Sequence, residues 1–347
     1  MKKMQRAWII LLVILFLTAL LGKLAPVKAQ TTSKFGIHIM RIEELPLARN
    51  FFNDLGIKAD QQQYVTLPLT LADLSQAAKW QQFFSQAKEL KLIPIVRLTT
   101  KFEGESWQIP SQKDIVDQLT FLSSLPWPTE QRYVIAYNEV NHANEWGGRL
   151  DPVGYAKVLH FVADWAHTEK QPLVILPAAL DLSAPNSKTT RDAFAFWNQV
   201  NQADPQVLAQ LDAWNSHSYP NPAFSSSPKK TGRQSVSGFE SELVWLDAKI
   251  PKKLEVFITE TGWENNSTTQ NWLSSYYEYS FDQVWSKERV RAVTPFILKG
   301  EPGPFAAFSF LDGQNQPTHQ YLSLKAAISR LAAQHELSLS ITPDDEL

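Results

Sequence analysis

The chain has 347 residues, with 33 basic and 35 acidic side chains, a formal net charge of −2 at pH 7, and no cysteine. This balance argues against a nucleic-acid-binding protein, which would carry a basic patch or stripe. The absence of cysteine excludes disulfides and cysteine-ligated metals. A folded domain here therefore depends on a large apolar core, which a chain of this length can bury.

The first 29 residues have the layout of a secretory signal peptide or an N-terminal membrane anchor. Lys2, Lys3 and Arg6 precede an apolar run at 7–22, and "VKA" ends at Ala29 with small residues at the −3 and −1 positions of a cleavage site. The run has 16 residues, fewer than the about 18–20 of a membrane-spanning helix, which favours cleavage over anchoring. We therefore expect an exported protein that is secreted, periplasmic or held at the outer face of the cytoplasmic membrane.

Residues 1–29 hold five basic and no acidic side chains, so 28 basic and 35 acidic side chains remain without them, a net charge of −7. This charge argues against a membrane-binding surface beyond the N-terminal segment, and again against nucleic acid as a partner. The same part of the chain keeps 11 of the 12 tryptophans. Tryptophan suits core packing, and its flat apolar face with a polar edge also suits stacking against sugar rings.

From residue 35 onward, short apolar runs alternate with longer stretches of helical periodicity. Eight strands are predicted, at 35–39, 64–69, 92–98, 133–138, 173–180, 211–219, 254–260 and 292–298. Helices are predicted near 43–55, 71–90, 112–124, 151–169, 189–203, 237–249, 270–288 and 322–335. A ninth apolar run, at 305–311, follows a turn rich in proline and glycine.

Eight strands that are each followed by a helix predict an α/β protein with a (β/α)8 TIM barrel as a single domain over 30–340. The strand at 64–69 is the least certain because Pro68 lies inside it. A doubly wound open sheet is the alternative, but no glycine-rich phosphate loop follows the first strand. The last residues, 341–347, are predicted to be an acidic tail.

In such a barrel the side chains at the carboxyl ends of the strands meet at one mouth, where the chemistry of these folds takes place. Two carboxylates, Glu139 and Glu260, end the fourth and seventh predicted strands. We expect them to converge with other polar side chains at strand ends, namely His38, Arg97, Asn138, His217 and Tyr219.

A pair of carboxyl groups about 5–5.5 Å apart suits retaining glycoside hydrolysis, in which one protonates the leaving oxygen and the other attacks the anomeric carbon. The two groups then need different pKa values. Tyr219 and Arg97 are candidates to hold Glu260 ionised. Either glutamate alone is as easily a solvated surface acid, because most glutamates are exposed.

These motifs resemble clan A of the glycoside hydrolases, the retaining (β/α)8 enzymes whose two catalytic glutamates end strands 4 and 7. The Asn-Glu pair at 138–139 matches the strand-4 motif, and "TETGW" at 259–263 matches the surroundings of the strand-7 glutamate. His217 and Tyr219 match a histidine and a tyrosine that many members carry on strand 6. The resemblance covers most of 35–335.

The resemblance implies a role for each matched residue. Glu139 would be the acid/base and Glu260 the nucleophile of an O-glycosidase that acts on an extracellular or cell-wall poly- or oligosaccharide. Asn138 would bind the sugar 2-hydroxyl, and Tyr219 would hydrogen-bond the nucleophile. No cofactor is implied, and we expect a monomer whose partner is its carbohydrate substrate.

The chain departs from the clan pattern in two places. Members usually carry a tryptophan at the end of strand 8, but no tryptophan follows Trp285, and Phe296, Phe308 and Phe310 stand in that region. The usual arginine of strand 2 has no match, and Arg97 on strand 3 is its possible replacement. These departures keep open a second hypothesis, an exported barrel that binds a glycan without cleaving it.

Three tryptophans follow predicted strands and could be sugar platforms or packing under a lid. Trp146 and Trp263 are candidate substrate-binding residues, whereas packing is favoured for Trp107. The histidines show no ligand spacing, so we expect no metal site, and a metal-dependent hydrolase is only a third hypothesis. Two long loops, 101–112 and 218–238, suggest an open cleft, and the second could cover the site.

Overall fold

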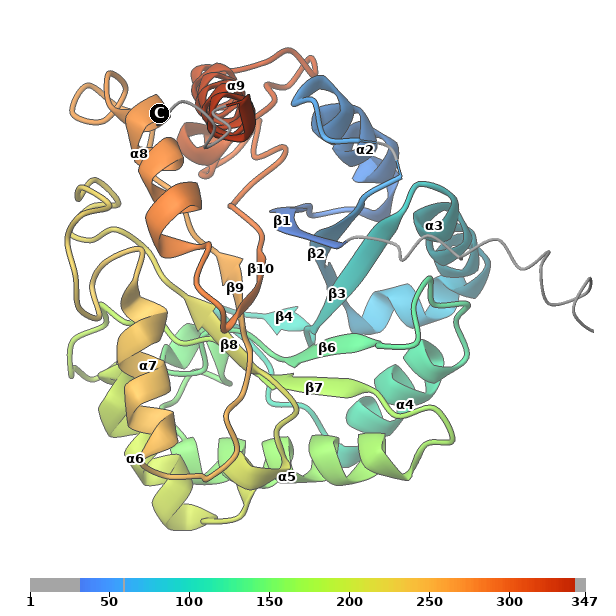
Figure 1. Ribbon diagram of the computed structural model, residues 1–347. Coiled ribbons are helices and arrows are strands. Elements are labelled where there is room, and N and C mark those ends of the chain that lie inside the picture. The colour runs from blue at the N-terminus through green and yellow to red at the C-terminus, as the bar shows by residue number, and fades with distance from the viewer. Residues whose placement is uncertain (1–31, 59, 341–347) are drawn as a thin grey trace, which may run out of the picture. The chain divides into compact units, whose positions relative to one another are not determined.

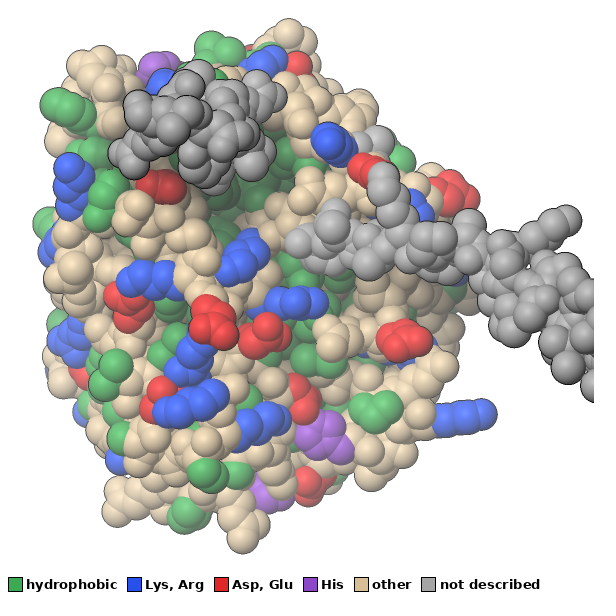
Figure 2. All heavy atoms as spheres, viewed as in Figure 1, with side chains coloured by type: hydrophobic (Ala, Val, Ile, Leu, Met, Phe, Trp, Pro, Cys, Tyr) green, Lys and Arg blue, Asp and Glu red, His purple; other side chains and the backbone are tan. Residues whose placement is uncertain are grey.

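The computed structural model describes residues 32–58 and 60–340, and the side chains of residues 33–58 and 60–334 (Figure 1). The predicted N-terminal signal or anchor and the acidic tail at 341–347 lie outside these residues. Within them, no helix combines the length and the apolar character needed to cross a bilayer. On the face seen in Figure 2, basic and acidic side chains are interspersed.

Eight parallel strands form one sheet in the order β7-β6-β3-β2-β1-β10-β9-β8. An isolated parallel bridge between Asp181 and His217 and a bond from Asp212 N to Ile175 O (3.2 Å) join the two end strands, so the ring nearly closes. The predicted (β/α)8 barrel is confirmed. Its strands are β1 (Thr32–His38), β2 (Gln62–Leu69), β3 (Leu92–Leu98), β6 (Tyr133–Ala136), β7 (Val174–Pro177), β8 (Trp214–His217), β9 (Val256–Glu260) and β10 (Val290–Val293).

Helices surround the strands in the predicted alternation (Figure 1). Asp151 caps the helix predicted at 151–169, as expected, by accepting a bond from Gly154 N at 2.7 Å. The helices are α2 (Leu45–Asp54), α3 (Ala77–Glu89), α4 (Gln112–Ser123), α5 (Pro152–Thr168), α6 (Ala193–Ala203), α7 (Gly238–Asp247), α8 (Leu273–Tyr279) and α9 (His319–Ser340). Short turns of helix are η1 (Ile42–Glu44), η2 (Leu71–Gln76), η3 (Ala143–Glu145), η4 (Val207–Gln210), η5 (Ser280–Val284) and η6 (Ala306–Phe308).

A small apolar cluster fills the inside of the barrel and fixes what can stand above it. Tyr64, Tyr133 and Phe257 pack there with ring centroids 4.8–6.0 Å apart. Because side chains alternate along a strand, Arg97 points to the same side of β3 as Ile95, one layer nearer the carboxyl end. The apolar layer thus closes the barrel below, and polar side chains gather above it.

Two loops differ from the sequence-based expectation. The ninth apolar run, 305–311, is not a strand: it contains η6 and folds back onto the segment after β10, with Phe310 N bonded to Ile297 O at 3.0 Å. The aromatic residues of this run pack on that segment. The run adds no strand to the sheet, because the eight strands of the ring already have partners. The loop at 101–112 contains a hairpin of β4 (Phe102–Glu103) and β5 (Ser106–Trp107).

Candidate active site

A cavity of about 750 Å³ opens at the carboxyl ends of the barrel strands. This volume lies in the upper part of the range of about 300–1,000 Å³ that is usual for ligand sites. Six of the predicted site residues line it: Arg97, Asn138, Glu139, Trp146, Tyr219 and Glu260. Barrel closure therefore brings together side chains that lie up to 163 positions apart in the sequence.

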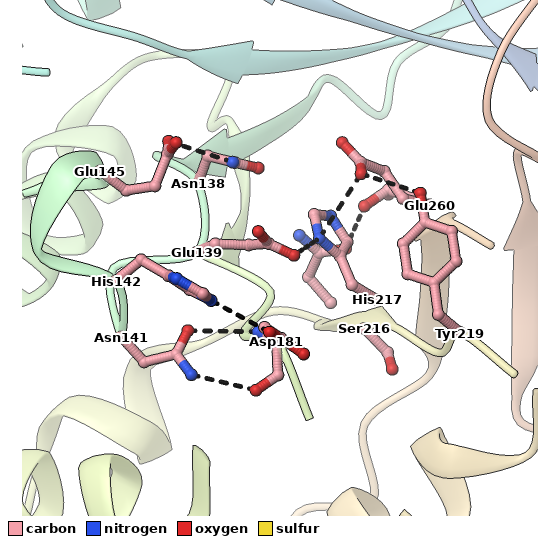
Figure 3. Close-up of polar contacts among 12 residues, drawn as sticks. Asn138, Glu139, Asn141, His142, Glu145, Asp181, Ser216, His217, Tyr219 and Glu260 are labelled. Carbon is pink, nitrogen blue, oxygen red and sulfur yellow. Dashed lines mark hydrogen bonds and ion pairs between the residues drawn. The ribbon is translucent and has the colours of Figure 1, made fainter. Parts of the chain in front are cut away.

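Glu260, the last residue of β9, receives donors from three other strands or strand ends. Arg97 Nη1 donates to its Oε1 at 2.5 Å. The Tyr219 hydroxyl donates to its Oε2 at 3.2 Å (Figure 3). His38 Nε2 lies 3.6 Å from Oε1, and His217 Nδ1 lies 3.8 Å from Oε2. The carboxylate is 9% exposed, so these contacts replace most of its water.

The surroundings of Glu260 keep it ionised. Burial alone would raise its pKa, but His217, Arg97 and His38 outweigh burial and lower the pKa to about 2. Burial raises the pKa of Tyr219 well above its usual value, so its hydroxyl stays a donor at neutral pH. A buried, ionised carboxylate with one face on the cavity has the charge state that a nucleophile needs.

Glu139 follows β6 on a backbone that turns sharply. Tyr137 and Glu139 have φ angles of 74° and 32°, a region that residues with a side chain seldom adopt. Glu139 N is bonded to Ala179 O at 3.0 Å, which ties this turn to the segment after the neighbouring strand β7. Such backbone strain is concentrated at functional sites in proteins. Here it places the Glu139 carboxyl in the cavity wall.

His217 joins the two glutamates. Its Nδ1 lies 2.9 Å from Glu139 Oε1 and 3.8 Å from Glu260 Oε2, so these oxygens are no farther apart than the sum of the two distances, 6.7 Å. Retaining pairs are about 5–5.5 Å apart and inverting pairs about 6.5–9.5 Å. This bound holds for one oxygen of each carboxyl, and it is compatible with the spacing of a retaining pair.

The pKa values of the two buried histidines are shifted in opposite directions. Burial acts to lower the pKa of His217, but Glu260 and Glu139 outweigh it and raise that pKa. For His38, burial and the nearby Arg97 lower the pKa to about 3, so the ring is neutral at ordinary pH. Neither histidine lines the cavity. Both lie beneath it and act on the carboxylates rather than offering a surface to a ligand, which corrects their prediction as substrate-binding residues.

Asn138 is oriented from both ends of its amide. Arg97 Nη1 donates to Asn138 Oδ1 at 2.8 Å. Asn138 Nδ2 donates to Glu145 Oε2 at 3.2 Å (Figure 3). Arg97 thus contacts both Glu260 and Asn138 from β3. The two bonds fix which side of the amide carries the donor.

Glu145 and the pair of His142 and Asp181 line the cavity and were not predicted as site residues. Burial and the nearby Glu139 raise the pKa of Glu145. His142 Nε2 lies 3.0 Å from Asp181 Oδ2, an interaction that raises the pKa of His142. The sequence signal was present in the polar run after Asn138, but only the turn through η3 shows which of its side chains point inward.

The aromatic side chains depart most from the prediction. Trp263 is 0% exposed, packs on Tyr277 and Trp285, and holds the loop 218–238 by donating to Ser226 O at 2.8 Å. Its indole cannot touch a ligand, so its prediction as a substrate-binding residue is wrong. Trp146 forms part of the cavity wall but is only 1% exposed, so it offers almost no surface for stacking.

Phenylalanines take the place of the missing strand-8 tryptophan. Phe296 follows β10, lines the cavity and packs on Phe305 and Phe308 with centroids 5.0 and 6.3 Å away. Phe224, from the loop after β8, meets Phe308 at 5.2 Å. Phe310 is fully buried on the core side and does not contribute. The β10 side of the cavity is therefore an aromatic wall.

The site offers acid/base and nucleophilic chemistry from its own side chains. Among the described residues, no group of three or more His, Asp or Glu side chains is arranged to hold a metal ion. The arrangement that is present, an ionised buried carboxylate beside a second carboxyl and fixed donors, suits displacement at an electrophilic carbon.

Comparison with known proteins gives a fold and no sequence family. No family profile matches the chain, and no curated protein sequence does either. A family 39 glycoside hydrolase from Bacteroides cellulosilyticus WH2 is similar in structure, with a TM-score of 0.60, 14% identity and coverage of 86% of this chain. The match spans 64% of that longer enzyme.

Two other solved structures match over most of their length. A triple mutant of an endo-β-1,4-glucanase from Xanthomonas axonopodis pv. citri has a TM-score of 0.53 and 13% identity, with 86% of this chain and 99% of that chain covered. An endo-1,4-β-mannanase from Rhizomucor miehei has a TM-score of 0.53 and 11% identity, with coverages of 86% and 94%. At these identities the comparisons establish the fold: this chain has the barrel of glycoside hydrolases, as its resemblance to clan A predicted.

Proposed function

We propose that the protein is a retaining O-glycoside hydrolase with Glu260 as nucleophile and Glu139 as acid/base. The observation that carries the proposal is the pair of carboxyl groups whose oxygens both approach His217 Nδ1, at 2.9 and 3.8 Å. The likeness of the barrel to those of a glucanase and a mannanase supports the same reaction class.

In the first step Glu139 protonates the glycosidic oxygen as the bond from this oxygen to the anomeric carbon breaks. A Glu260 oxygen attacks that carbon and forms a glycosyl ester. Arg97 and Tyr219 hold Glu260 ionised before the attack. As the ester forms, the negative charge of Glu260 that these two side chains contact decreases. In the second step Glu139, now a carboxylate, takes a proton from water, the water oxygen attacks the anomeric carbon, and Glu260 leaves as a carboxylate.

Asn138 fits a role in binding the 2-hydroxyl of the sugar under attack. Its amide is held by Arg97 and Glu145 between the two catalytic carboxyls, and hydrogen bonds at the 2-position strengthen in the transition state of these reactions. The substrate is proposed to be a poly- or oligosaccharide outside the cell, where the predicted signal or anchor at 1–29 would deliver the enzyme. The protein is proposed to act as a monomer.

The first test combines product stereochemistry with variants of the two glutamates. Proton NMR during hydrolysis of β-1,4-glucan or β-1,4-mannan oligosaccharides should show a β-anomer released first. Glu260→Ala should lower kcat by at least about 10⁴-fold, the scale of losing a covalent nucleophile. Glu139→Ala should lower it about 10²–10⁴-fold, and less for aryl glycosides whose leaving group needs no proton. Circular dichroism checks that each variant is folded.

Several outcomes would contradict the proposal. Release of the inverted anomer, or turnover by Glu260→Ala at the wild-type rate, would exclude the retaining mechanism with this nucleophile. Glycan binding by the wild type without any product would favour the glycan-binding barrel. Activity that a chelator removes would favour the metal-dependent alternative.

A further inference from the structure

We propose that Trp107 is the platform of a sugar-binding subsite on the Glu139 side of the cavity, so that the leaving group of the substrate is itself a sugar. The inference rests on the proposed function and adds to it the residue that would bind the leaving sugar. It concerns a tryptophan for which the sequence favoured a packing role.

Trp107 lies on a hairpin that stands at the mouth of the cavity. β4 and β5 pair with Phe102 opposite Trp107, and the turn between them contains Gly104 at a φ of +63°. Because directly opposed residues of an antiparallel pair lie on the same face, the two rings are neighbours, with centroids 5.4 Å apart and planes at 69°. Phe102 is 54% exposed and lies outside the cavity lining, which places it on the outer side of Trp107.

The hairpin is fixed to the catalytic loop rather than free. Gly147 N donates to Trp107 O at 2.7 Å, which joins the hairpin to the segment directly after η3. At its base, Gln108 N donates to Lys101 O at 2.9 Å, and the Thr100 hydroxyl donates to Gln108 O at 2.6 Å. The backbone that carries Trp107 is thus tied to the turn that carries Glu145, the last residue of η3, so ordering this loop on binding costs little.

Of the tryptophans that line the cavity, Trp107 is the one whose side chain has exposed surface that a ligand can contact. Trp146 is 1% exposed, whereas Trp107 is only partly buried. Its cavity neighbours Thr100, Gln108 and Glu145 are polar. An apolar ring face bordered by hydroxyl, amide and carboxylate groups matches a pyranose ring, which has an apolar face and hydroxyl groups around its edge.

The order of the strands places this subsite relative to the reaction. β3, which the hairpin follows, pairs with β6, which delivers Glu139, while the aromatic wall of Phe296 and Phe308 follows β10 on another side of the ring. Glu139 is the group that would protonate the leaving oxygen, so a ring bound beside it belongs to the leaving group. The substrate would then cross the cavity from the Phe296 wall to Trp107, with the scissile bond between them.

The test compares substrates that reach the subsite with one whose leaving group is not a sugar. The probes are β-1,4-linked oligosaccharides of glucose and mannose, two to six units long, and the 4-nitrophenyl β-glycosides of both sugars. In Trp107→Ala the ratio of kcat/KM for the oligosaccharide to that for the nitrophenyl glycoside should fall about tenfold, the loss expected for one aromatic contact. Trp107→Phe should recover most of this ratio.

Trp272→Ala is the matched control, because Trp272 is 57% exposed and lies outside this cavity. The ratio should keep its wild-type value in this variant. An unchanged ratio in Trp107→Ala, or an equal loss on both kinds of substrate, would overturn the subsite. If the wild type hydrolyses none of the probes, the proposed function fails. Calorimetric binding of the hexasaccharides then tests the subsite separately: weaker binding by Trp107→Ala supports it, and equal binding overturns it.

Discussion

At the scale of single residues, one guanidinium helps to keep Glu260 ionised. Arg97 contacts the carboxylate at 2.5 Å and has Asn138 as its other partner, so it is the fixed cation of the site. Burial alone would push the carboxyl toward its neutral form, and a neutral carboxyl cannot attack an anomeric carbon.

Arg97→Met is therefore expected to move the acid limb of the pH profile of kcat/KM. The pKa of Glu260 is lowered to about 2 in part by Arg97. Without the guanidinium this pKa rises, so the ionised fraction falls at a higher pH, and the limb should shift upward by about 1–3 pH units. Arg149→Met is the control, since its side chain pairs with Asp151 at 3.4 Å outside the cavity. An acid limb that stays in place would contradict this account of Glu260.

At the scale of elements, a buried carboxyl joins helix α7 to strand β8 directly below the site. Glu242 is 1% exposed and accepts a bond from the Ser216 hydroxyl, and Ser216 precedes His217. Ser218 continues the link by accepting a bond from Phe239 N at 2.8 Å. The helix thereby fixes the strand end that carries His217 and leads to Tyr219.

This contact predicts a pH-dependent stability. Burial raises the pKa of Glu242 from 4.5 to about 7. Because the pKa of Glu242 is raised in the folded protein, the contribution of this carboxyl to stability is complete below pH 4.5 and is lost as the pH rises through 7. The Glu242→Gln variant has no carboxyl that could ionise at this position. Between pH 5 and pH 8 its unfolding free energy should therefore rise relative to that of the wild type, by an amount on the order of 3 kcal/mol. The thermal midpoints of the two proteins measure this change.

Glu240→Gln on the same helix is the control for this measurement, because Glu240 is paired with Lys287 at the surface. Its difference from the wild type should change little over the same pH range. A constant gap between Glu242→Gln and the wild type would show that Glu242 does not carry the effect.

At the scale of the whole molecule, we expect the charge of the side chains that line the cavity to affect which glycans bind. Five carboxylates line the cavity, Glu139, Glu145, Asp181, Glu260 and Glu264, against Arg97 and His142. Arg97 is bonded to Glu260 and His142 to Asp181, so neither cation is free for an anionic sugar. The chain also carries a net negative charge of −2, or −7 without residues 1–29. A cleft lined by one sign of charge repels ligands of the same sign over several ångströms.

We therefore expect neutral oligosaccharides to be cleaved faster than carboxylated ones of the same linkage and length. The difference in kcat/KM between neutral and carboxylated oligosaccharides should become smaller when the salt concentration is raised from 10 mM to about 1 M, because the screening length falls from about 30 to 3 Å. The neutral substrate provides the internal control, because its rate should depend little on salt. A carboxylated substrate that is preferred at low salt would contradict the prediction.

The two glutamates proposed to carry the chemistry were singled out from the sequence because the apolar run of a barrel strand ends where the strand reaches the mouth. An apolar run that stops at Asn138-Glu139 or at Glu260 shows both the strand and the side chain that it delivers, and the pattern of eight such runs predicts the ring that gathers them. The strand with Pro68 was also correct, since β2 pairs with β3 along this stretch. Arg97, His217 and Tyr219 followed from the same rule.

The sequence alone did not decide which aromatic and acidic side chains face the cavity. Trp107, Trp146 and Trp263 all follow strands, yet one borders the cavity with surface to offer, one is almost covered, and one supports a loop from the core. Periodicity describes a strand or helix, whereas the path of a loop depends on contacts with distant segments, such as the bond from Gly147 to Trp107. The local pattern therefore determined the barrel and the proposed catalytic pair, and only the tertiary packing of the loops determined the walls that surround them.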